Sequence, residues 1–174
     1  VGMSMSSLIR VELGNCGDIL GDSQVFNSMI TAHALVMIFF SVMPIMLGGF
    51  GNWLLPLKKM CPDMMFPRLN NFSFWLLPGS LLLLTLSSIS GEGVGAGWTL
   101  YPPLSGVEYH PTSSTDLGIF SLHVAGLSSI AASINFISTF AAAPNTPTEM
   151  EKISLFSWSL FLTTILLLLA LPVL

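Results

Sequence analysis

The residue best suited to chemistry is the histidine at position 33, which lies within residues 31–40, an otherwise apolar stretch. On a helix of 3.6 residues per turn, Met37, Phe40 and Pro44 share its face. A neutral imidazole between apolar and aromatic side chains can bind the iron of a flat apolar cofactor such as haem. Hydrogen bonding between helices and proton relay remain as alternatives, because an ionisable side chain at membrane depth serves these roles too.

The other two histidines do not complete such a site. His123 lies in a later apolar segment and is a candidate second ligand of a bis-histidine haem, although nothing near it repeats the pattern at His33. His110 lies in the Gly-, Pro- and Tyr-rich residues 90–116, which predict an ordered loop, and we expect its side chain to be solvated. Three histidines cannot form a copper centre and a haem site together, so redox chemistry needs ligands from elsewhere.

A second pattern consists of polar side chains that recur every seven residues. Ser121, Ser128 and Asn135 drift only about 20° per heptad around a helix, and Ser129 widens their stripe. Hydroxyl and amide groups along one helix face inside a membrane can hold a file of water molecules, which a proton path requires. The alternative is that small residues in this segment only allow helices to pack closely.

Asp63 is placed to collect protons for such a path. It lies in a polar loop, and amide and hydroxyl side chains flank it on both sides, at Asn52, Asn70 and Ser73. The alternative is an ordinary loop carboxylate that pairs with Arg68.

The elements that must position these residues are membrane helices. The chain is 52% hydrophobic and 8% charged, with a mean hydropathy of +0.79, which is too apolar for a soluble domain of 174 residues. Because both termini lie in apolar sequence, we expect a single all-α transmembrane region, residues 1–174, that is an internal fragment of a larger polytopic protein. Four segments reach the length of about 18 to 25 residues that crosses a bilayer, namely residues 31–55, 72–89, 117–143 and 153–174, whereas residues 1–9 are too short.

The loops between these spans differ in charge. Alternating spans place the loops around Asp18 and Gly95 on one side and the loops at residues 58–70 and 144–152 on the other. By the positive-inside rule the second side faces the cytoplasm or matrix. The net charge of −4 is a sum over two faces and says little about a partner. From the apolar composition we expect a lipid bilayer around the chain, and we expect no nucleic-acid partner. The cations of the second side are Lys58, Lys59, Arg68 and Lys152, whereas the first side has Arg10 with Glu12, Asp18, Asp22, Glu92, Glu108 and Asp116.

Glycine and proline interrupt the spans. Gly48, Gly49 and Gly51 are expected to close the first long span and to let neighbouring helices approach closely. Pro44 and Pro78 lie inside spans, where a kink is tolerated if neighbouring groups satisfy the freed carbonyls.

Several long motifs resemble subunit I of the haem-copper oxidases, in its animal mitochondrial form. Together they cover essentially the whole chain, which would run from the end of the first helix into the fifth of a twelve-helix core. The motifs are the run from Thr31 to Phe40, Met43-Pro44-Ile45-Met46, Gly48-Gly49-Phe50-Gly51-Asn52-Trp53-Leu54, Pro62-Asp63-Met64, Phe66-Pro67-Arg68-Leu69-Asn70-Asn71, Phe74-Trp75-Leu76-Leu77-Pro78, Gly97-Trp98-Thr99, Tyr101-Pro102-Pro103-Leu104 and Phe120-Ser121-Leu122-His123.

The resemblance implies roles for individual residues. His33 matches the axial ligand of the low-spin haem a, whose second ligand lies on a later helix, and Arg10 matches the arginine that hydrogen-bonds the haem formyl group. Glu12 and Gly17 match residues of a peripheral calcium or sodium site. Asp63 matches the carboxylate at the entrance of the D proton pathway, and residues of its lining are matched by Asn52, Asn70, Ser73, Ser128, Ser129 and Asn135.

The resemblance also implies a function for the whole subunit. Such an oxidase takes electrons from cytochrome c through subunit II, passes them through haem a to a haem a3 and copper B centre, and reduces dioxygen to water while pumping protons. It works in the mitochondrial inner membrane with subunits II and III. Because the ligands of haem a3 and copper B lie outside this sequence, the catalytic site is incomplete and the fragment alone should be inactive.

Two other classes of function remain open on the residues alone. A b-type cytochrome anchor would use His33 and His123 as paired haem ligands. A transporter or channel subunit would use the face of Ser121, Ser128 and Asn135 as a substrate path without haem.

Overall fold

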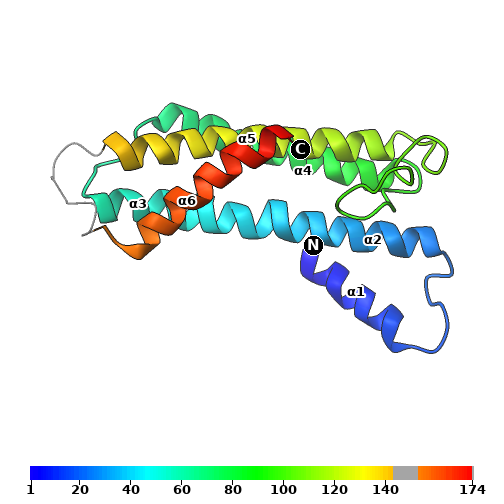
Figure 1. Cartoon of the computed structure of the whole chain (residues 1–174). Helices are drawn as coiled ribbons and strands as arrows, with labels where there is room; N and C mark the ends of the chain where they lie inside the picture. Colours follow the sequence, from blue (N-terminus) through cyan, green and yellow to red (C-terminus); the bar gives the residue numbers. More distant parts are fainter. Residues whose placement is uncertain (143–152, 174) are drawn as a thin grey trace. The chain divides into compact units, whose positions relative to one another are not determined.

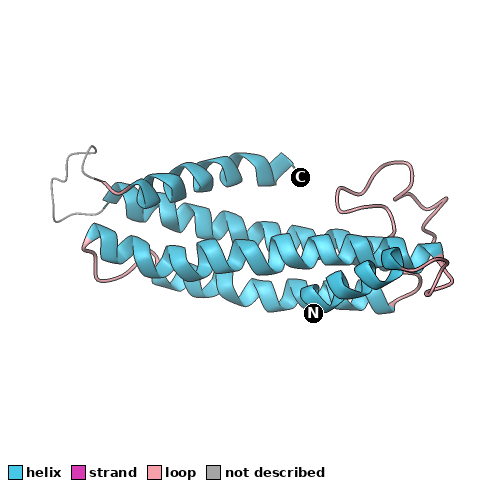
Figure 2. Cartoon of the chain, turned by 90° about the horizontal axis from the view of Figure 1, so that it is seen from below, coloured by secondary structure: helices cyan, strands magenta, loops and turns pink. Residues whose placement is uncertain are grey.

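Each of the four apolar segments forms a helix. The computed structural model describes residues 1–142 and 153–173, and within these ranges four helices are long and apolar enough to cross a membrane. Helix is the only regular secondary structure in the described ranges (Figure 2). The predicted all-α polytopic membrane fold is confirmed. The four helices are Ser23–Lys59, Pro67–Ile89, Ser114–Ala142 and Leu155–Val173.

The first of these helices changes its winding along its length. It begins at Asp22, whose Oδ1 accepts a hydrogen bond from the backbone N–H of Gln24 at 2.8 Å. Its middle part has the wider π winding, and Pro44, which has no N–H to donate, stands at the start of the second π segment. The consecutive segments are α2 (Ser23–Leu35), η1 (Val36–Val42), η2 (Pro44–Gly51) and α3 (Asn52–Lys59).

The prediction that three glycines end this helix is wrong. Helical structure continues past Gly48, Gly49 and Gly51 to Lys59. A glycine costs a helix only about 1 kcal/mol and keeps its N–H and C=O groups available for hydrogen bonds. The chain turns instead at Met60, which adopts the left-handed conformation with φ 55°.

The remaining helices follow in chain order. α1 (Gly2–Gly14) comes first, and the loop at residues 15–22 joins it to α2 (Figure 1). The predicted polar loop at residues 144–152, which contains Pro147 and Lys152, lies outside the described residues. The later elements are α4 (Pro67–Ile89), α5 (Ser114–Ala142), α6 (Leu155–Ala170) and the short 3-10 helix η4 (Leu171–Val173).

Two compact units make up the chain, and each has its own core. Unit 1 consists of Val1–Val42 and Gly79–His123. Its core centres on Leu35, Leu84 and Leu122, which come from three different helices and are at most 9% exposed. Further apolar side chains that pack against this core are Val36, Phe39, Phe40 and Leu100.

Unit 2 consists of Met43–Pro78 and Val124–Leu174. Aromatic side chains dominate one end of its core, where the rings of Phe140 and Phe161 stack with centroids 4.3 Å apart. The ammonium group of Lys59 lies 4.3 Å from the Phe140 ring centroid, a cation–π contact at the end of α3. The buried core residues are Leu55, Met64, Phe136, Phe140 and Leu160.

One of the three glycines in η2 allows close packing within unit 2. Gly51 is buried, and a Cβ atom at this position would lie 2.8 Å from Cζ of Phe136. The prediction of close helix approach is therefore confirmed for Gly51. A Cβ at Gly48 would meet no other described residue within 4 Å.

Candidate functional site

His33 lies in unit 1, where α1 meets α2. Its Nδ1 is 2.9 Å from the backbone carbonyl oxygen of Gly2. A carbonyl oxygen can only accept a hydrogen bond, so Nδ1 carries the hydrogen and the neutral ring has its lone pair on Nε2. No described residue forms a hydrogen bond with Nε2. Metal-binding histidines are held in this way, with one nitrogen donating to a carbonyl, so the residues present fit ligation of haem iron.

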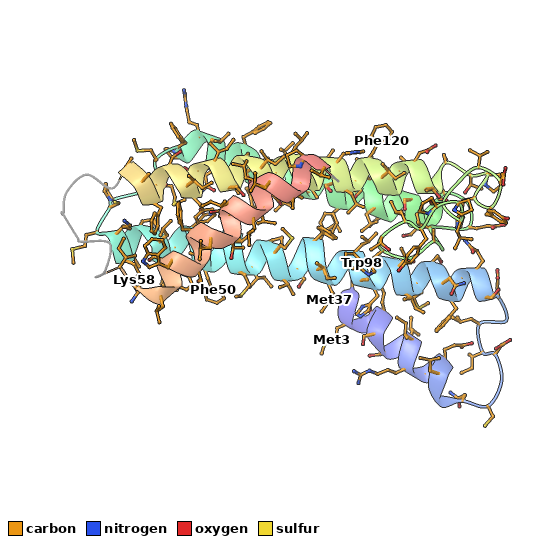
Figure 3. All side chains as sticks on the ribbon, viewed as in Figure 1. Met3, Met37, Phe50, Lys58, Trp98 and Phe120 are labelled. Atoms are coloured by element: carbon orange, nitrogen blue, oxygen red, sulfur yellow. The ribbon has the colours of Figure 1, made fainter. Side chains whose placement is uncertain are left out.

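The contact at Gly2 depends on the absence of a side chain. Gly2 is buried, and a Cβ atom there would collide with Sδ of Met37. Figure 3 labels Met3 and Met37 at the place where the start of α1 meets the first long helix. The side chain of Met37 thus lies directly beside Gly2, whose carbonyl group accepts the hydrogen bond from His33.

Arg10, the predicted contact of the haem formyl group, lies on α1. Its side chain is exposed and forms no ion pair within the described part of the chain. Its guanidinium group is therefore available to a ligand beside α1, and its role stays a prediction.

The predicted peripheral cation site lies at the loop between α1 and α2. Glu12 and Gly17 line a pocket of about 330 Å³ together with Asp18 and Asp22. Both carboxylate oxygens of Glu12 accept the backbone N–H of Ile19, at 3.1 and 3.2 Å. In residues 1–142 and 153–173, no group of three or more His, Cys, Asp or Glu side chains could hold a metal ion. Glu12 thus holds the loop through these hydrogen bonds, and the cation site stays a prediction that needs a further ligand.

His110 is buried, and the expectation of a solvated side chain is wrong. Its Nε2 accepts the backbone N–H of Gly95 at 3.1 Å and lies 3.1 Å from the amide nitrogen of Gln24. Its Nδ1 donates to the backbone carbonyl of Leu104 at 2.6 Å. The Gly95 bond requires an unprotonated Nε2, and the Leu104 bond requires a hydrogen on Nδ1. The imidazole therefore links two parts of the loop between α4 and α5, residues 90–113, to α2. Only 6% of His110 is exposed.

His123 lies on α5 with an exposed side chain. Its ring centroid is 6.4 Å from that of Phe120, which Figure 3 labels. Among the described residues, no contact links it to His33. The role of His123 as a second haem ligand stays a prediction.

Asp63, the predicted proton-collecting carboxylate, is exposed in the loop between α3 and α4 of unit 2. Its Oδ1 accepts the backbone N–H of Met64 at 2.7 Å. The structure describes both Asp63 and Arg68, and they form no ion pair. Met64 is only 3% exposed and packs in the core of unit 2. The exposed Asp63 is therefore followed directly by a residue that is fixed in the core.

Two side chains of α5 hold the backbone that follows this carboxylate. The N–H of Met65 donates to Oγ1 of Thr139 at 3.0 Å, and the N–H of Phe66 donates to Oδ1 of Asn135 at 2.9 Å. Asn135 is fully buried, and its Nδ2 has no hydrogen-bond partner among the described residues. Sequence reasoning identified Asn135 but missed Thr139, although its position four residues later places it on the same helix face.

Three residues predicted to line the proton path share a cavity in unit 2. Asn52, Asn70 and Ser73 contribute the polar part of the wall of this cavity, which has a volume of about 630 Å³. Nδ2 of Asn52 donates to the carbonyl of Gly48 at 2.8 Å, whereas its buried Oδ1 has no partner among the described residues. A buried amide oxygen without a protein partner is suited to an ordered water molecule. Asp63 does not line the cavity.

Buried serines join α4 and α5 in reciprocal pairs. In unit 2, Ser73 Oγ donates to the carbonyl of Ser128 at 2.8 Å, and Ser128 Oγ donates to the carbonyl of Ser73 at 2.6 Å. In unit 1, Ser80 and Ser121 form the same pair at 2.6 and 2.8 Å. For Ser121, these bonds support the alternative that small residues of this segment allow the helices to pack closely.

The pairing partners on α4 were missed, although the sequence carries a signal for them. Serines recur every seven residues on α4 as well as on α5, and antiparallel helices with matching heptads bring such residues together. Ser129 is half-buried and is absent from the cavity wall and from these pairs. The heptad serines are Ser73, Ser80 and Ser87 on α4 and Ser114, Ser121 and Ser128 on α5, all of them buried.

Comparison with known proteins identifies the family. The model of the family described as "Cytochrome C and Quinol oxidase polypeptide I" matches residues 1–174. Cytochrome c oxidase subunit 1 of Yarrowia lipolytica is 50% identical over 176 residues, and the match covers 100% of this chain and 33% of the relative. The subunits of the animals Mytilus edulis and Pecten maximus are each 49% identical over 174 residues, with 99% of this chain covered and 32% and 36% of the relatives. The chain therefore spans about a third of the length of these relatives. It belongs to the cytochrome c and quinol oxidase polypeptide I family.

Proposed function

We propose that this chain is a section of the core catalytic subunit of a respiratory terminal oxidase. The full-length protein takes electrons from cytochrome c, reduces dioxygen to water and moves protons across the membrane. When bound, haem a, haem a3 and copper B supply the electron transfer and the reduction of dioxygen. Residues 1–174 form one transmembrane region of that subunit and are inactive alone, since the ligands of haem a3 and copper B come from other parts of it.

The observation that carries this proposal is the hydrogen bond between His33 and Gly2. The 2.9 Å bond from Nδ1 fixes the plane of the imidazole and leaves the lone pair of Nε2 for the iron of the low-spin haem a. Arg10 donates to the formyl group of the same haem. A later helix of the subunit would supply the other protein ligand of this haem.

Unit 2 provides the input part of a proton route, the D pathway. The exposed carboxylate of Asp63 collects protons at the surface. The unpaired Oδ1 of Asn52 offers an acceptor to ordered water, and the unpaired Nδ2 of Asn135 offers a donor. The other lining residues are Asn70, Ser73, Ser128 and Ser129.

The surroundings of the chain follow from the same assignment. The subunit lies in the mitochondrial inner membrane as a multi-pass protein, with residues 58–70 and 144–152 on the matrix side. Subunits II and III are its neighbours, and cytochrome c delivers electrons through subunit II. Glu12 and Gly17 bind a peripheral calcium or sodium ion together with a ligand from elsewhere.

The other classes of function have less support. A b-type cytochrome anchor needs His33 and His123 as a pair, but the match of the whole chain to the oxidase subunit family favours the oxidase assignment. The match of the whole chain to the family described as "Cytochrome C and Quinol oxidase polypeptide I" favours an oxidase subunit over a transporter path along α5.

A substitution at Asp63 tests the proton route. In the assembled oxidase, Asp63→Asn should slow proton-limited turnover by about a hundredfold, because an amide cannot collect and release protons. The low-spin haem spectrum should not change. Glu108→Gln removes an exposed acid from the 90–113 loop and should leave the proton-to-electron ratio unchanged. A normal ratio in Asp63→Asn would contradict the route.

The continuation of the reading frame tests the family role independently. Beyond Leu174, a haem-copper oxidase subunit must have a Trp-His-Pro-Glu-Val-like copper motif and a later His-His pair. If neither follows, this chain is not part of a working oxidase subunit.

A further inference from the structure

We propose that Thr139 is a positioning residue that holds Asp63 in place for proton uptake, a role that rests on the proposed function of Asp63. Thr139 is 3% exposed and lies on α5 of unit 2. It does not touch the carboxylate of Asp63. It acts on the backbone two residues further along the chain.

Three successive backbone N–H groups after Asp63 are bound by side-chain oxygens. The N–H of Met64 donates to Asp63 itself at 2.7 Å, and the N–H of Met65 donates to Thr139 at 3.0 Å. The third N–H, that of Phe66, donates to Asn135 at 2.9 Å. Two of the three acceptors come from α5, so the loop is fastened to this helix directly after the carboxylate.

The hydroxyl group of Thr139 is oriented for this bond. Its hydrogen is donated to the backbone carbonyl of Asn135 at 2.7 Å, so a lone pair of Oγ1 is available to the N–H of Met65. Thr139 and Asn135 are both buried, so bulk water cannot readily replace either acceptor. We call these two side chains the α5 clamp.

The clamp matters because proton transfer is sensitive to geometry. A displacement of about 1 Å between reacting groups can cost about a hundredfold in rate. Met64 anchors the loop in the apolar core, and the clamp fixes the direction in which the backbone leaves that anchor. Loss of one clamp bond should therefore move the carboxylate of Asp63 without unfolding the unit.

Amide hydrogen exchange in the assembled oxidase tests the structural part of the proposal. Thr139→Val keeps the shape of the side chain but removes the acceptor, and should speed exchange at Met65 about fivefold, the loss of one ordinary hydrogen bond. Thr139→Ser keeps the hydroxyl and should restore slow exchange. The matched control is Thr163→Val on α6, where the hydroxyl donates only to its own helix at the carbonyl of Ser159. Unchanged exchange in Thr139→Val would overturn the clamp.

Turnover and proton pumping test the positioning part. Thr139→Val should lower proton-limited turnover about fivefold and shift its pH profile, with an unchanged KM for reduced cytochrome c and an unchanged low-spin haem spectrum. Thr139→Ser should rescue all of this. The double variant Thr139→Val with Asp63→Asn should be no slower than Asp63→Asn alone, because Thr139 acts through Asp63. A further loss in the double variant would overturn the positioning role.

The two proposals can fail separately. If Asp63→Asn alone leaves proton uptake normal, the proton-route assignment is wrong, and the positioning role falls with it. The exchange rate at Met65 still decides whether the clamp holds the loop. If Asp63→Asn blocks uptake but Thr139→Val and Thr139→Ser behave alike, the route stands and the positioning role is wrong.

Discussion

The imidazole of His33 donates a hydrogen bond to the backbone carbonyl of Gly2 at 2.9 Å, which ties the start of α1 to the last turn of α2. No substitution at Gly2 removes its backbone carbonyl. The hydrogen bond therefore depends on how closely α1 approaches α2. The approach is possible because Gly2 has no Cβ next to Met37. The backbone of a residue on another helix thus supplies the hydrogen-bond acceptor for the proposed haem ligand.

Gly2→Ala should disturb His33 without touching it. The added methyl group collides with the sulfur of Met37, so either the Met37 side chain or the backbone at Gly2 has to shift. A shift of the backbone moves the carbonyl away from Nδ1. We expect a shifted low-spin haem band and haem affinity lower by about ten- to a hundredfold, the usual cost of losing an outer-shell partner. Absorption spectra of the assembled oxidase measure both. Gly14→Ala on the same helix meets no other described residue within 4 Å and should have the spectrum of the unsubstituted protein. Identical spectra for both variants would contradict the coupling.

His110→Ala should loosen the 90–113 loop. It leaves the N–H of Gly95 and the carbonyl of Leu104 without the imidazole, at a cost of about 1–3 kcal/mol in the free energy of unfolding. Chemical denaturation and amide exchange at Gly95 measure the effect. The matched control is His123→Ala, an exposed histidine that should change stability by less than about 0.5 kcal/mol. Equal stability of the two variants would mean that the burial of His110 contributes nothing.

Ser80 and Ser121 should be energetically coupled. A double-mutant cycle with alanine at both positions should give an interaction energy of about 0.6 kcal/mol, and at most about 1.7 kcal/mol, the range for hydrogen bonds between membrane helices. The free energy of unfolding in detergent is the measured quantity. A parallel cycle with Ser88, whose hydroxyl donates to Leu84 on its own helix at 3.2 Å, should give no coupling to Ser121. The coupling is expected because the two hydroxyl oxygens lie 3.3 Å apart, in addition to the bonds that each makes to a backbone carbonyl. Additive effects of Ser80 and Ser121 would show that the two hydroxyl groups do not interact.

The membrane helices were predictable because hydrocarbon imposes a simple rule on sequence. A backbone in lipid must satisfy its own hydrogen bonds, so length and apolarity locate the spans. His33 was also predictable as a functional residue, because a polar group in such a segment is costly. The ends of the spans were less clear. Gly48 and Gly51 led us to predict that the helix ends there, but it continues to Lys59. A glycine weakens a helix without removing its hydrogen bonds.

The contacts that hold the site could not be predicted, because they join residues far apart in the chain. His110 looked like a loop histidine, and its burial depends on Gln24, which is 86 residues earlier. The acceptor of His33 is a backbone carbonyl 31 residues away, which no pattern of side chains reveals. Thr139 and Met65 are 74 residues apart. Only the serine pairs had a signal in the sequence, in the matching heptads of α4 and α5.

Ligation of the low-spin haem by His33 can be tested by the absorption spectrum of the assembled oxidase with His33→Ala. The low-spin haem a band should disappear from this spectrum, because the iron loses one of its ligands. His123→Ala, prepared in parallel, should keep the band. A low-spin band of normal position and intensity in His33→Ala would contradict the claim.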